Sequence, residues 1–251
     1  MAIQKDFDYI YSDMKIGLYG YGKMGKTIER LAKERGHEII LKIGTENADS
    51  ITAGDLNKAD VIIEFTRPEL AVSHITNCFE AGVPIIVGTT GWYDSYPEIK
   101  NTCEAKNGAL LAATNFSVGV NLFFELNKRL AQLMQPHSSY NVSVEEIHHT
   151  QKLDAPSGTA ITITEGIIEN YPNKNQWVID QSPKENDIEI IAKRLPDVPG
   201  THEVNYTSVI DDISIKHTAH NRDGFALGAI IAAEFIKDKH GIFTMNDVLK
   251  L

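Results

Sequence analysis

The sequence has few features that would place it in a membrane or outside a reducing compartment. It contains 2 cysteines in 251 residues, and Cys78 and Cys103 match neither a metal-binding nor a redox spacing, so we expect a reduced, cytoplasmic setting. No apolar run approaches the about 18 residues that a membrane-spanning helix needs. The polar start lacks the apolar segment of a secretory signal, and we interpret residues 1–13 as an extension outside the fold.

Positive charge is also scarce. Lysine and arginine together number 24 against 34 acidic residues, which gives a formal net charge of −10. Nucleic-acid binding requires a positive surface and is not expected. An anionic small molecule requires only a local group of cations beside a motif. The composition, 42% hydrophobic and 23% charged, is ordinary for a globular protein of one large or two modest domains.

Short apolar segments alternate with amphipathic segments through the first half of the chain. This rhythm predicts a doubly wound parallel sheet, because each strand is followed by a crossover helix. The expected strands are 14–20, 38–43, 59–66, 83–90 and 109–116, and the expected helices are 22–35, about 68–81 and about 94–107.

The second half follows a different plan, in which several strands come in succession. That order predicts a mixed or antiparallel sheet in a separate α+β domain. We expect strands at 140–149, 187–195, 201–209 and 213–221, and helices at 117–134, about 158–170 and 225–239. The predicted domains are 1–117 for dinucleotide binding, 118–222 for substrate binding and oligomerisation, and 223–251 as a helix returning to the first domain.

A glycine-rich turn follows the first expected strand and opens the first expected helix. Gly20, Tyr21, Gly22, Lys23, Met24 and Gly25 fit G-x-G-x-x-G, the turn of Rossmann-type sheets in which backbone approaches a pyrophosphate at a helix N-terminus. We therefore predict dinucleotide binding. A turn that only packs, or a ligand that carries only a phosphate, is compatible with the same pattern.

The residues that end the other strands are mostly small or able to form hydrogen bonds. Parallel strands end at one edge of a sheet, so these residues are expected to line the same crevice. The predicted cofactor-binding residues there are Phe65, Thr66, Arg67, Gly88, Thr89, Thr90, Ala113, Thr114, Asn115 and Phe116. Each segment alone is compatible with a simple strand-to-helix turn.

The residue that would contact the ribose 2′ position is not evident after the second strand. Lys42 favours a 2′-phosphate and Glu46 a free hydroxyl, so the two pull in opposite directions. We therefore expect the protein to use both NADH and NADPH, with kcat/KM values for the two cofactors that differ by no more than about tenfold.

Residues 145–160, EEIHHTQKLDAPSGTA, concentrate proton-bearing groups. If the strand continues, Glu146, His148, Thr150 and Lys152 share one face. Histidine exchanges protons near neutral pH, and lysine both holds an anion and donates a proton.

The same stretch ends where a helix is expected to begin. Ser157, Gly158 and Thr159 offer hydroxyls and free N–H groups, which suit a carboxylate. Ser157 is also a natural N-cap, and no G-x-S-x-G supports it as a nucleophile. His148 and His149 lack a third ligand at a plausible spacing, so no metal is expected.

The pattern E-x-H-H-x-x-K-x-D-A-P-S-G-T-A resembles the signature of the 4-hydroxy-tetrahydrodipicolinate reductase family, also called dihydrodipicolinate reductases, of bacterial lysine and diaminopimelate biosynthesis. The resemblance extends over nearly the whole chain. It includes Glu64-Phe65-Thr66-Arg67-Pro68, Val87-Gly88-Thr89-Thr90-Gly91, Asn115-Phe116-Ser117-Val118-Gly119-Val120-Asn121 and Gly241-Ile242-Phe243.

The resemblance implies a homotetramer and a nicotinamide cofactor that delivers hydride to ring C4 of a cyclic dicarboxylate. It implies that His148 donates or accepts the proton and that Lys152 donates a second proton and holds substrate. His149, Gly158 and Thr159 would bind substrate as well. A short 44–60 region and a tighter glycine turn than the common G-x-x-G-x-x-G differ from many members and leave the cofactor preference open.

Two other functions share parts of this pattern. Another Rossmann dehydrogenase, acting for example on aspartate or homoserine, would keep the glycine-rich turn without H-H-x-x-K followed by D-A-P-S-G-T-A. A non-catalytic nucleotide sensor need not retain His148 or Lys152. Both residues are present, which favours the reductase.

Overall fold

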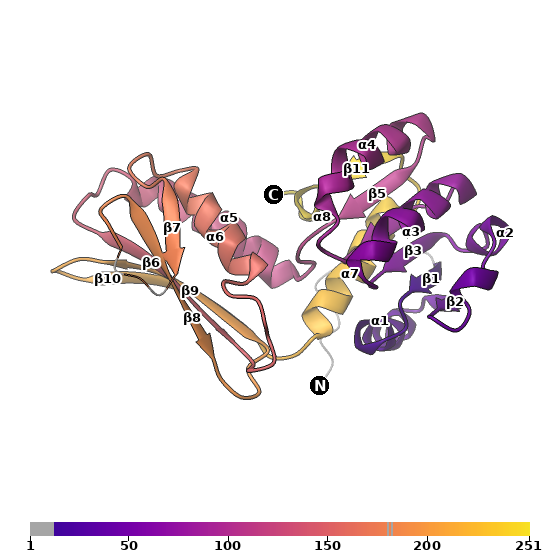
Figure 1. Cartoon of the computed structure of the whole chain (residues 1–251), viewed down its shortest axis with the longest axis horizontal. Coiled ribbons are helices and arrows are strands. Elements are labelled where there is room, and N and C mark those ends of the chain that lie inside the picture. Colours follow the sequence, from indigo (N-terminus) through magenta and orange to yellow (C-terminus); the bar gives the residue numbers. More distant parts are fainter. Residues whose placement is uncertain (1–12, 180, 182) are drawn as a thin grey trace. The chain divides into compact units, whose positions relative to one another are not determined.

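Two separate units account for residues 13–179, 181 and 183–251, which the computed structural model describes (Figure 1). The first unit contains the chain up to Ala113 and Ala229–Thr244. The second contains Thr114–Gly228 and Met245–Leu251. Residues 1–12 of the expected N-terminal extension lie outside the described residues.

A parallel sheet forms the centre of the first unit, in the strand order β11-β5-β4-β3-β1-β2. Every neighbouring pair is parallel, which confirms the predicted doubly wound α/β fold. The order reverses between β1 and β3, and such switch points are where these sheets bind ligands. The strands are β1 (Lys15–Tyr19), β2 (Glu38–Ile43), β3 (Val61–Glu64), β4 (Ile85–Val87), β5 (Ala109–Ala112) and β11 (Gly241–Phe243).

The helices of the first unit begin and end where local chemistry favours it. In α3 (Pro68–Ala81), proline occupies the first turn and Gly82 ends the helix in the left-handed region at φ +67°. Ile75, Cys78 and Phe79 repeat at helical spacing and are buried. The other helices are α1 (Lys23–Glu34), α2 (Ala53–Leu56) and α4 (Tyr96–Ala105), with 3₁₀ turns at Ala48–Ser50 and Tyr93–Ser95.

The second unit has a mixed sheet in the order β10-β9-β6-β8-β7, as predicted. β6 pairs parallel with β8 and antiparallel with β9. Two helices, α5 (Val118–Met134) and α6 (Gly158–Ile168), pack against one face of it (Figure 1). The strands are β6 (Asn141–His148), β7 (Gln176–Ile179), β8 (Asp187–Arg194), β9 (Gly200–Thr207) and β10 (Asp212–Ala219).

Burial alternates along β6. Val142, Val144, Glu146 and His148 are buried, and the residues between them are partly exposed. The strand ends at His148, so the expected continuation of the same face to Lys152 is wrong. The reason is local, because the Lys152 N–H bonds the carbonyl of His149 at 3.1 Å and closes a turn.

Several short elements were not foreseen, namely α2, β7, β11 and α8 (Met245–Leu249). Each has five residues or fewer, which is too few for a periodic pattern to show. The long α7 (Asp223–Ile236) corresponds to the expected C-terminal helix. Among the residues that the structure describes, no helix has the length and apolar character needed to cross a membrane.

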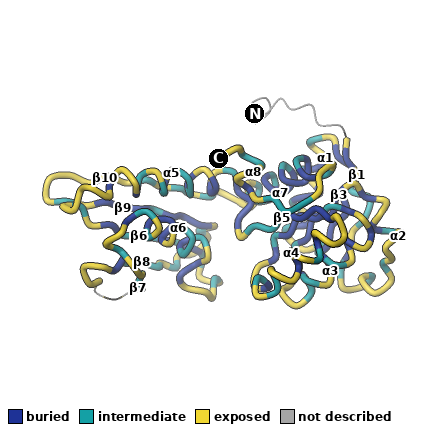
Figure 2. The backbone as a smooth tube through the Cα atoms, turned by 90° about the horizontal axis from the view of Figure 1, so that it is seen from above, coloured by how far each residue is buried: buried dark blue, intermediate teal, exposed yellow. Residues whose placement is uncertain are grey.

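Each unit contains its own hydrophobic core (Figure 2). In the first, Ile62, Ile85 and Leu110 from the sheet meet Ile75 and Phe79 from α3. In the second, residues such as Val144, Ile190 and Tyr206 from the sheet meet Phe123 and Ile163 from α5 and α6.

A buried ionic cluster attaches α7 to the first unit. Both oxygens of Glu234 accept bonds from Arg35 at 2.9 Å, and His37 Nε2 lies 2.8 Å from Glu234 Oε1. The Glu234 side chain is 1% exposed, so its charge depends on these partners for solvation. The cluster connects residues almost 200 positions apart in the chain.

Replacing Glu234 by alanine should destabilise the first unit by about 3 kcal/mol, because breaking a buried pair leaves its partners unpaired. Glu34→Ala is the matched control, since Glu34 pairs with Arg30 at an exposed position and should cost under about 1 kcal/mol. Urea unfolding, followed by far-UV circular dichroism, measures both. Equal losses in the two variants would contradict this role for Glu234.

Candidate active site

A cavity of about 490 Å³ lies at the switch point of the first unit. Its walls come from the segments that follow β1, β3 and β4, three places where cofactor contacts were predicted. The residues that line it are Gly22, Lys23, Met24, Phe65, Thr66, Pro68, Gly88, Thr89 and Thr90.

The glycine-rich turn has the backbone that its spacing predicts. Gly20 adopts φ +91°, and a Cβ there would lie 2.1 Å from the carbonyl oxygen of Phe65. A Cβ on Gly25 would lie 2.3 Å from the carbonyl oxygen of Gly20. These two positions therefore exclude any side chain. A Cβ on Gly22 would meet nothing within 4 Å, which leaves open space over the turn.

This geometry fits a dinucleotide. Gly22 is the N-cap residue of α1, and no side chain caps the helix there. The first N–H groups of α1 and the positive end of the helix dipole are thus available to a phosphate. Thr66 and Thr89 are joined by a 2.8 Å bond from the Thr66 N–H to the Thr89 hydroxyl, which fixes two walls of the cavity to each other.

The remaining predicted cofactor residues lie elsewhere. Tyr21 and Lys42 contact each other and Glu29, with Lys42 Nζ 4.7 Å from the centre of the Tyr21 ring. Arg67 is exposed at the N-cap of α3. Ala113 is the last residue of the first unit before the chain enters the second.

Thr114, Asn115 and Phe116 belong to the second unit. The Asn115 side chain accepts a bond from the Ser117 N–H at 2.9 Å and donates to the Thr159 hydroxyl at 3.3 Å. Asn115 therefore supports the start of α6 and the start of α5 at once.

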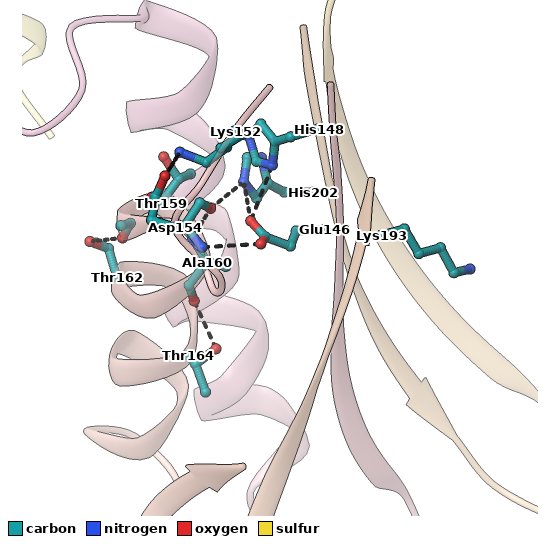
Figure 3. A network of polar contacts seen from close by, with 12 residues as sticks. Glu146, His148, Lys152, Asp154, Thr159, Ala160, Thr162, Thr164, Lys193 and His202 are labelled. Atoms are coloured by element: carbon teal, nitrogen blue, oxygen red, sulfur yellow. Dashed lines mark hydrogen bonds and ion pairs between the residues drawn. The ribbon is translucent and has the colours of Figure 1, made fainter. Parts of the chain in front are cut away.

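A buried carboxylate, Glu146, organises the candidate site of the second unit (Figure 3). Its Oε1 accepts from the Ser157 N–H at 3.0 Å and from Arg194 Nη2 at 3.1 Å. Its Oε2 lies 3.2 Å from His148 Nδ1. Burial raises the pKa of Glu146, but the contacts from His148 and Ser157 outweigh it and lower this pKa to about 2. Glu146 is thus ionised at neutral pH.

The contact with Glu146 orients the predicted proton-transfer residue, His148. Glu146 Oε2 also lies 3.8 Å from His202 Nε2, and no described residue makes a well-aligned hydrogen bond to this oxygen or to His148 Nδ1. A carboxylate at Nδ1 favours the tautomer that carries its proton on that nitrogen. The other nitrogen, Nε2, lies beside Gly200, where an added Cβ would be 3.1 Å away.

His202 and Arg194 belong to this cluster and were not predicted from the sequence. In the strand registers, His202 lies opposite Glu146 and Arg194 lies opposite His148. The His202 ring meets the His148 ring edge-on at 5.0 Å, and its Nε2 lies 3.3 Å from the Ser157 hydroxyl. Burial, and then the charge of His148, lower the pKa of His202 to about 3, so His202 is neutral. The sequence offered one indication of His202, because a histidine stands there on the apolar face of the expected strand 201–209.

Lys152 extends from the loop after β6 and reaches Asp154 (Figure 3). Its Nζ lies 2.9 and 2.8 Å from the two oxygens of Asp154, and its side chain is 23% exposed. Burial acts to raise the pKa of Asp154, but the bond from Lys152 lowers it overall. The ammonium group is therefore partly accessible and, among the described contacts, is held by the exposed carboxylate of Asp154 alone.

The predicted carboxylate site is the N-terminus of α6. Ser157 is its N-cap, and the Ser157 hydroxyl accepts from the Ala160 N–H at 3.2 Å. Gly158 is exposed and Thr159 is half-buried. His149 comes just after β6 and lies outside the Glu146 cluster, and its Nδ1 is buried with no hydrogen-bonding partner in the described part of the chain.

The cluster offers more metal ligands than the sequence indicated. Glu146, His148 and His202 each present one ligand atom, and these atoms lie within 4.8 Å of one another. The prediction considered ligands near His148 and His149 along the chain, whereas strand pairing places His202 beside His148. Arg194 places a positive charge 3.1 Å from the same carboxylate, which opposes a cation at this position.

Comparison with known proteins supports the sequence resemblance. A family model described as dihydrodipicolinate reductase, N-terminus, matches residues 14–116, and one described as dihydrodipicolinate reductase, C-terminus, matches residues 119–249. The 4-hydroxy-tetrahydrodipicolinate reductase of Christiangramia forsetii is 51% identical over 238 residues, covering 94% of this chain and 98% of that relative. The reductase of the same name from Neisseria meningitidis is 35% identical over 230 residues, covering 89% of this chain and 84% of that relative.

Solved structures share the fold at lower identity. A dipicolinate-bound dihydrodipicolinate reductase from Paenisporosarcina sp. TG-14 has a TM-score of 0.69 at 21% identity, covering 93% of this chain and 98% of that chain. An amine dehydrogenase from Mycobacterium smegmatis has a TM-score of 0.61 at 10% identity, covering 94% of this chain and 96% of that chain. The fold alone is therefore shared with enzymes of other specificity. Both family models and the relative of 51% identity, in contrast, indicate the same family of reductases. The chain belongs to the dihydrodipicolinate reductase family.

Proposed function

We propose that this chain reduces 4-hydroxy-tetrahydrodipicolinate to tetrahydrodipicolinate with NADH or NADPH, with loss of water, in lysine and diaminopimelate biosynthesis. The observation that carries the proposal is the Glu146–His148 pair beside Lys152 and the N-terminus of α6, in a chain of this family. The family's relatives bear the name of this reaction.

The first group of residues binds the substrate. Lys152 and the N–H groups of Gly158 and Thr159 at the start of α6 hold a substrate carboxylate, because a cation and a helix N-terminus both favour an anion. His149 contributes a further polar contact. The dipicolinate in the related structure is a cyclic dicarboxylate, which supports this substrate class.

His148 exchanges the proton. Glu146 holds the ring through Nδ1, which leaves Nε2 to exchange the proton with the substrate. The glycine-rich turn, Phe65–Arg67, Gly88–Thr90 and the Ala113–Phe116 segment hold the cofactor, which supplies hydride when bound. Lys152 donates a second proton in this assignment.

The direct test is a coupled assay. The product of the preceding synthase is supplied with each cofactor in turn, and oxidation of the nicotinamide is followed by absorbance. We expect substrate-dependent oxidation of both NADH and NADPH. Oxidation of neither cofactor would refute the proposed reaction.

We also propose that the chain forms a homotetramer through the face of the mixed sheet opposite α5 and α6. That face presents half-exposed side chains, including the ion pairs Glu145–Lys193 at 2.7 Å and Glu203–Lys216 at 2.9 Å. The family resemblance supports this assembly. Analytical ultracentrifugation should give four times the chain mass of 27.9 kDa. A monomer or dimer mass at micromolar concentration would exclude the tetramer.

We propose a cytoplasmic location for the enzyme. Cys78 and Cys103 are both free and buried, as expected for thiols kept reduced. Burial raises the pKa of the Cys103 thiol, which makes it a poor nucleophile and slow to oxidise.

Lys152→Ala should lower kcat at least about a hundredfold, the range expected when a positioned proton-transfer group is lost. KM for the dicarboxylate should also rise because an anion contact is removed, while NADH affinity stays nearly constant. Lys128→Ala is the control, since Lys128 pairs with Glu125 on α5 at 3.6 Å. Near-normal turnover of the Lys152 variant would remove Lys152 from the mechanism.

Thr159→Val should weaken a dicarboxylate analogue such as dipicolinate by roughly 1.5–3 kcal/mol, the value of a hydrogen bond to a charged group. Cofactor affinity should change much less. Thr162→Val is the matched control, because that hydroxyl bonds only the Gly158 carbonyl of its own helix among the described contacts, at 3.0 Å (Figure 3). Calorimetry compares the two, and equal analogue affinity in both variants would mean that Thr159 does not bind substrate.

A further inference from the structure

A charged cluster lies beside the glycine-rich turn and is here called the Glu29 cluster, consisting of Tyr21, Glu29, Lys33 and Lys42. Lys33 Nζ and Lys42 Nζ each lie 2.7 Å from Glu29 Oε1. The Tyr21 hydroxyl donates to Glu29 Oε2. The Glu29 side chain is 11% exposed, and the Lys42 side chain is 40% exposed. Each carboxylate oxygen of Glu29 thus has at least one donor.

The cluster lies at the end of the sheet where the 2′ position of a cofactor ribose is recognised. The Gly20 N–H bonds the Ile43 carbonyl at 2.8 Å, which holds the end of β2 against the turn. Lys42 is the last residue but one of β2. In dinucleotide-binding sheets, a side chain about 20 residues after the glycine motif contacts the ribose 2′ group. Lys42 occupies that place, and here its ammonium group is directed to Glu29.

Glu29 is charged under all ordinary conditions. Bonds from Lys33, Lys42 and Tyr21 lower the pKa of Glu29 to about 2. The bond from Glu29, in turn, raises the pKa of Lys42. The positive charge of Lys42 is therefore already paired before any cofactor arrives.

We propose that Glu29 is a specificity-determining residue that limits the use of NADPH by engaging Lys42 and opposing a 2′-phosphate. This inference rests on the proposed use of a nicotinamide cofactor. A 2′-phosphate carries about −1.5 to −2 charges and must share Lys42 with a carboxylate of the same sign. A ribose 2′-hydroxyl is neutral and accepts a bond from Lys42 without disturbing the pair. Tyr21 positions Glu29 from the turn.

The test compares cofactor binding in Glu29→Gln with the unmodified enzyme. Glutamine keeps the size and a hydrogen-bonding oxygen but removes the charge. Calorimetry with NADPH and with NADH gives the ratio of the two affinities, and we expect this ratio to move about tenfold toward NADPH. The kcat/KM ratio should move the same way. Glu34→Gln is the control, because Glu34 lies on the same helix in an exposed pair with Arg30 and should leave the ratio unchanged.

A ratio that changes less than threefold, or moves toward NADH, would overturn the role of Glu29. If Glu29→Gln does not fold, Lys42→Gln decides the question. A tenfold or larger fall in NADPH preference in that variant would show that Lys42 already serves the phosphate, contrary to the proposal. A smaller fall agrees with a lysine engaged by Glu29. Failure of the unmodified enzyme to bind either cofactor would instead refute the proposed function.

Discussion

The contacts of the buried Glu146 carboxylate are the interactions on which the candidate site of the second unit depends. An ionised group without solvent is tolerated only when donors surround it, and here Ser157, Arg194 and His148 do so. The same contacts connect β6 and β8 to the start of α6. One charge therefore fixes the orientation of His148 and the position of the α6 N-terminus, the two groups to which we assign proton transfer and carboxylate binding.

The first unit uses backbone where the second uses side chains. Gly20 and Gly25 leave no room for a Cβ, and Gly22 leaves open space above the start of α1, so the main chain shapes the wall of the cavity that the glycine-rich turn provides. Beside the same turn, the Glu29 cluster adds charged side chains. In a chain of net charge −10, cations such as Lys42, Lys152 and Arg194 are paired with carboxylates. In the proposed function, a substrate carboxylate competes with Asp154 for Lys152.

Much of the fold was predictable because its patterns are local. The expected helix at 68–81 coincides with α3, since proline begins it and Gly82 ends it. The alternation at 140–149 predicted β6 and its buried face, on which Glu146 and His148 both lie. The extension of that face to Lys152 failed, because a turn of one hydrogen bond ends the strand and carries no periodic signal. β7 and β11 were too short for any pattern.

The sequence by itself determined the glycine-rich turn, the order of the longer strands and helices, and the stretch that holds His148, Lys152 and Thr159, because each depends on neighbours along the chain. Only the tertiary structure decided that His202 stands opposite Glu146, that Arg194 stands opposite His148 and that Glu29 holds Lys42. Those partners come from other strands or from a helix face. Their meeting depends on strand register and helix packing, and both are set by the burial of whole surfaces rather than by any local motif.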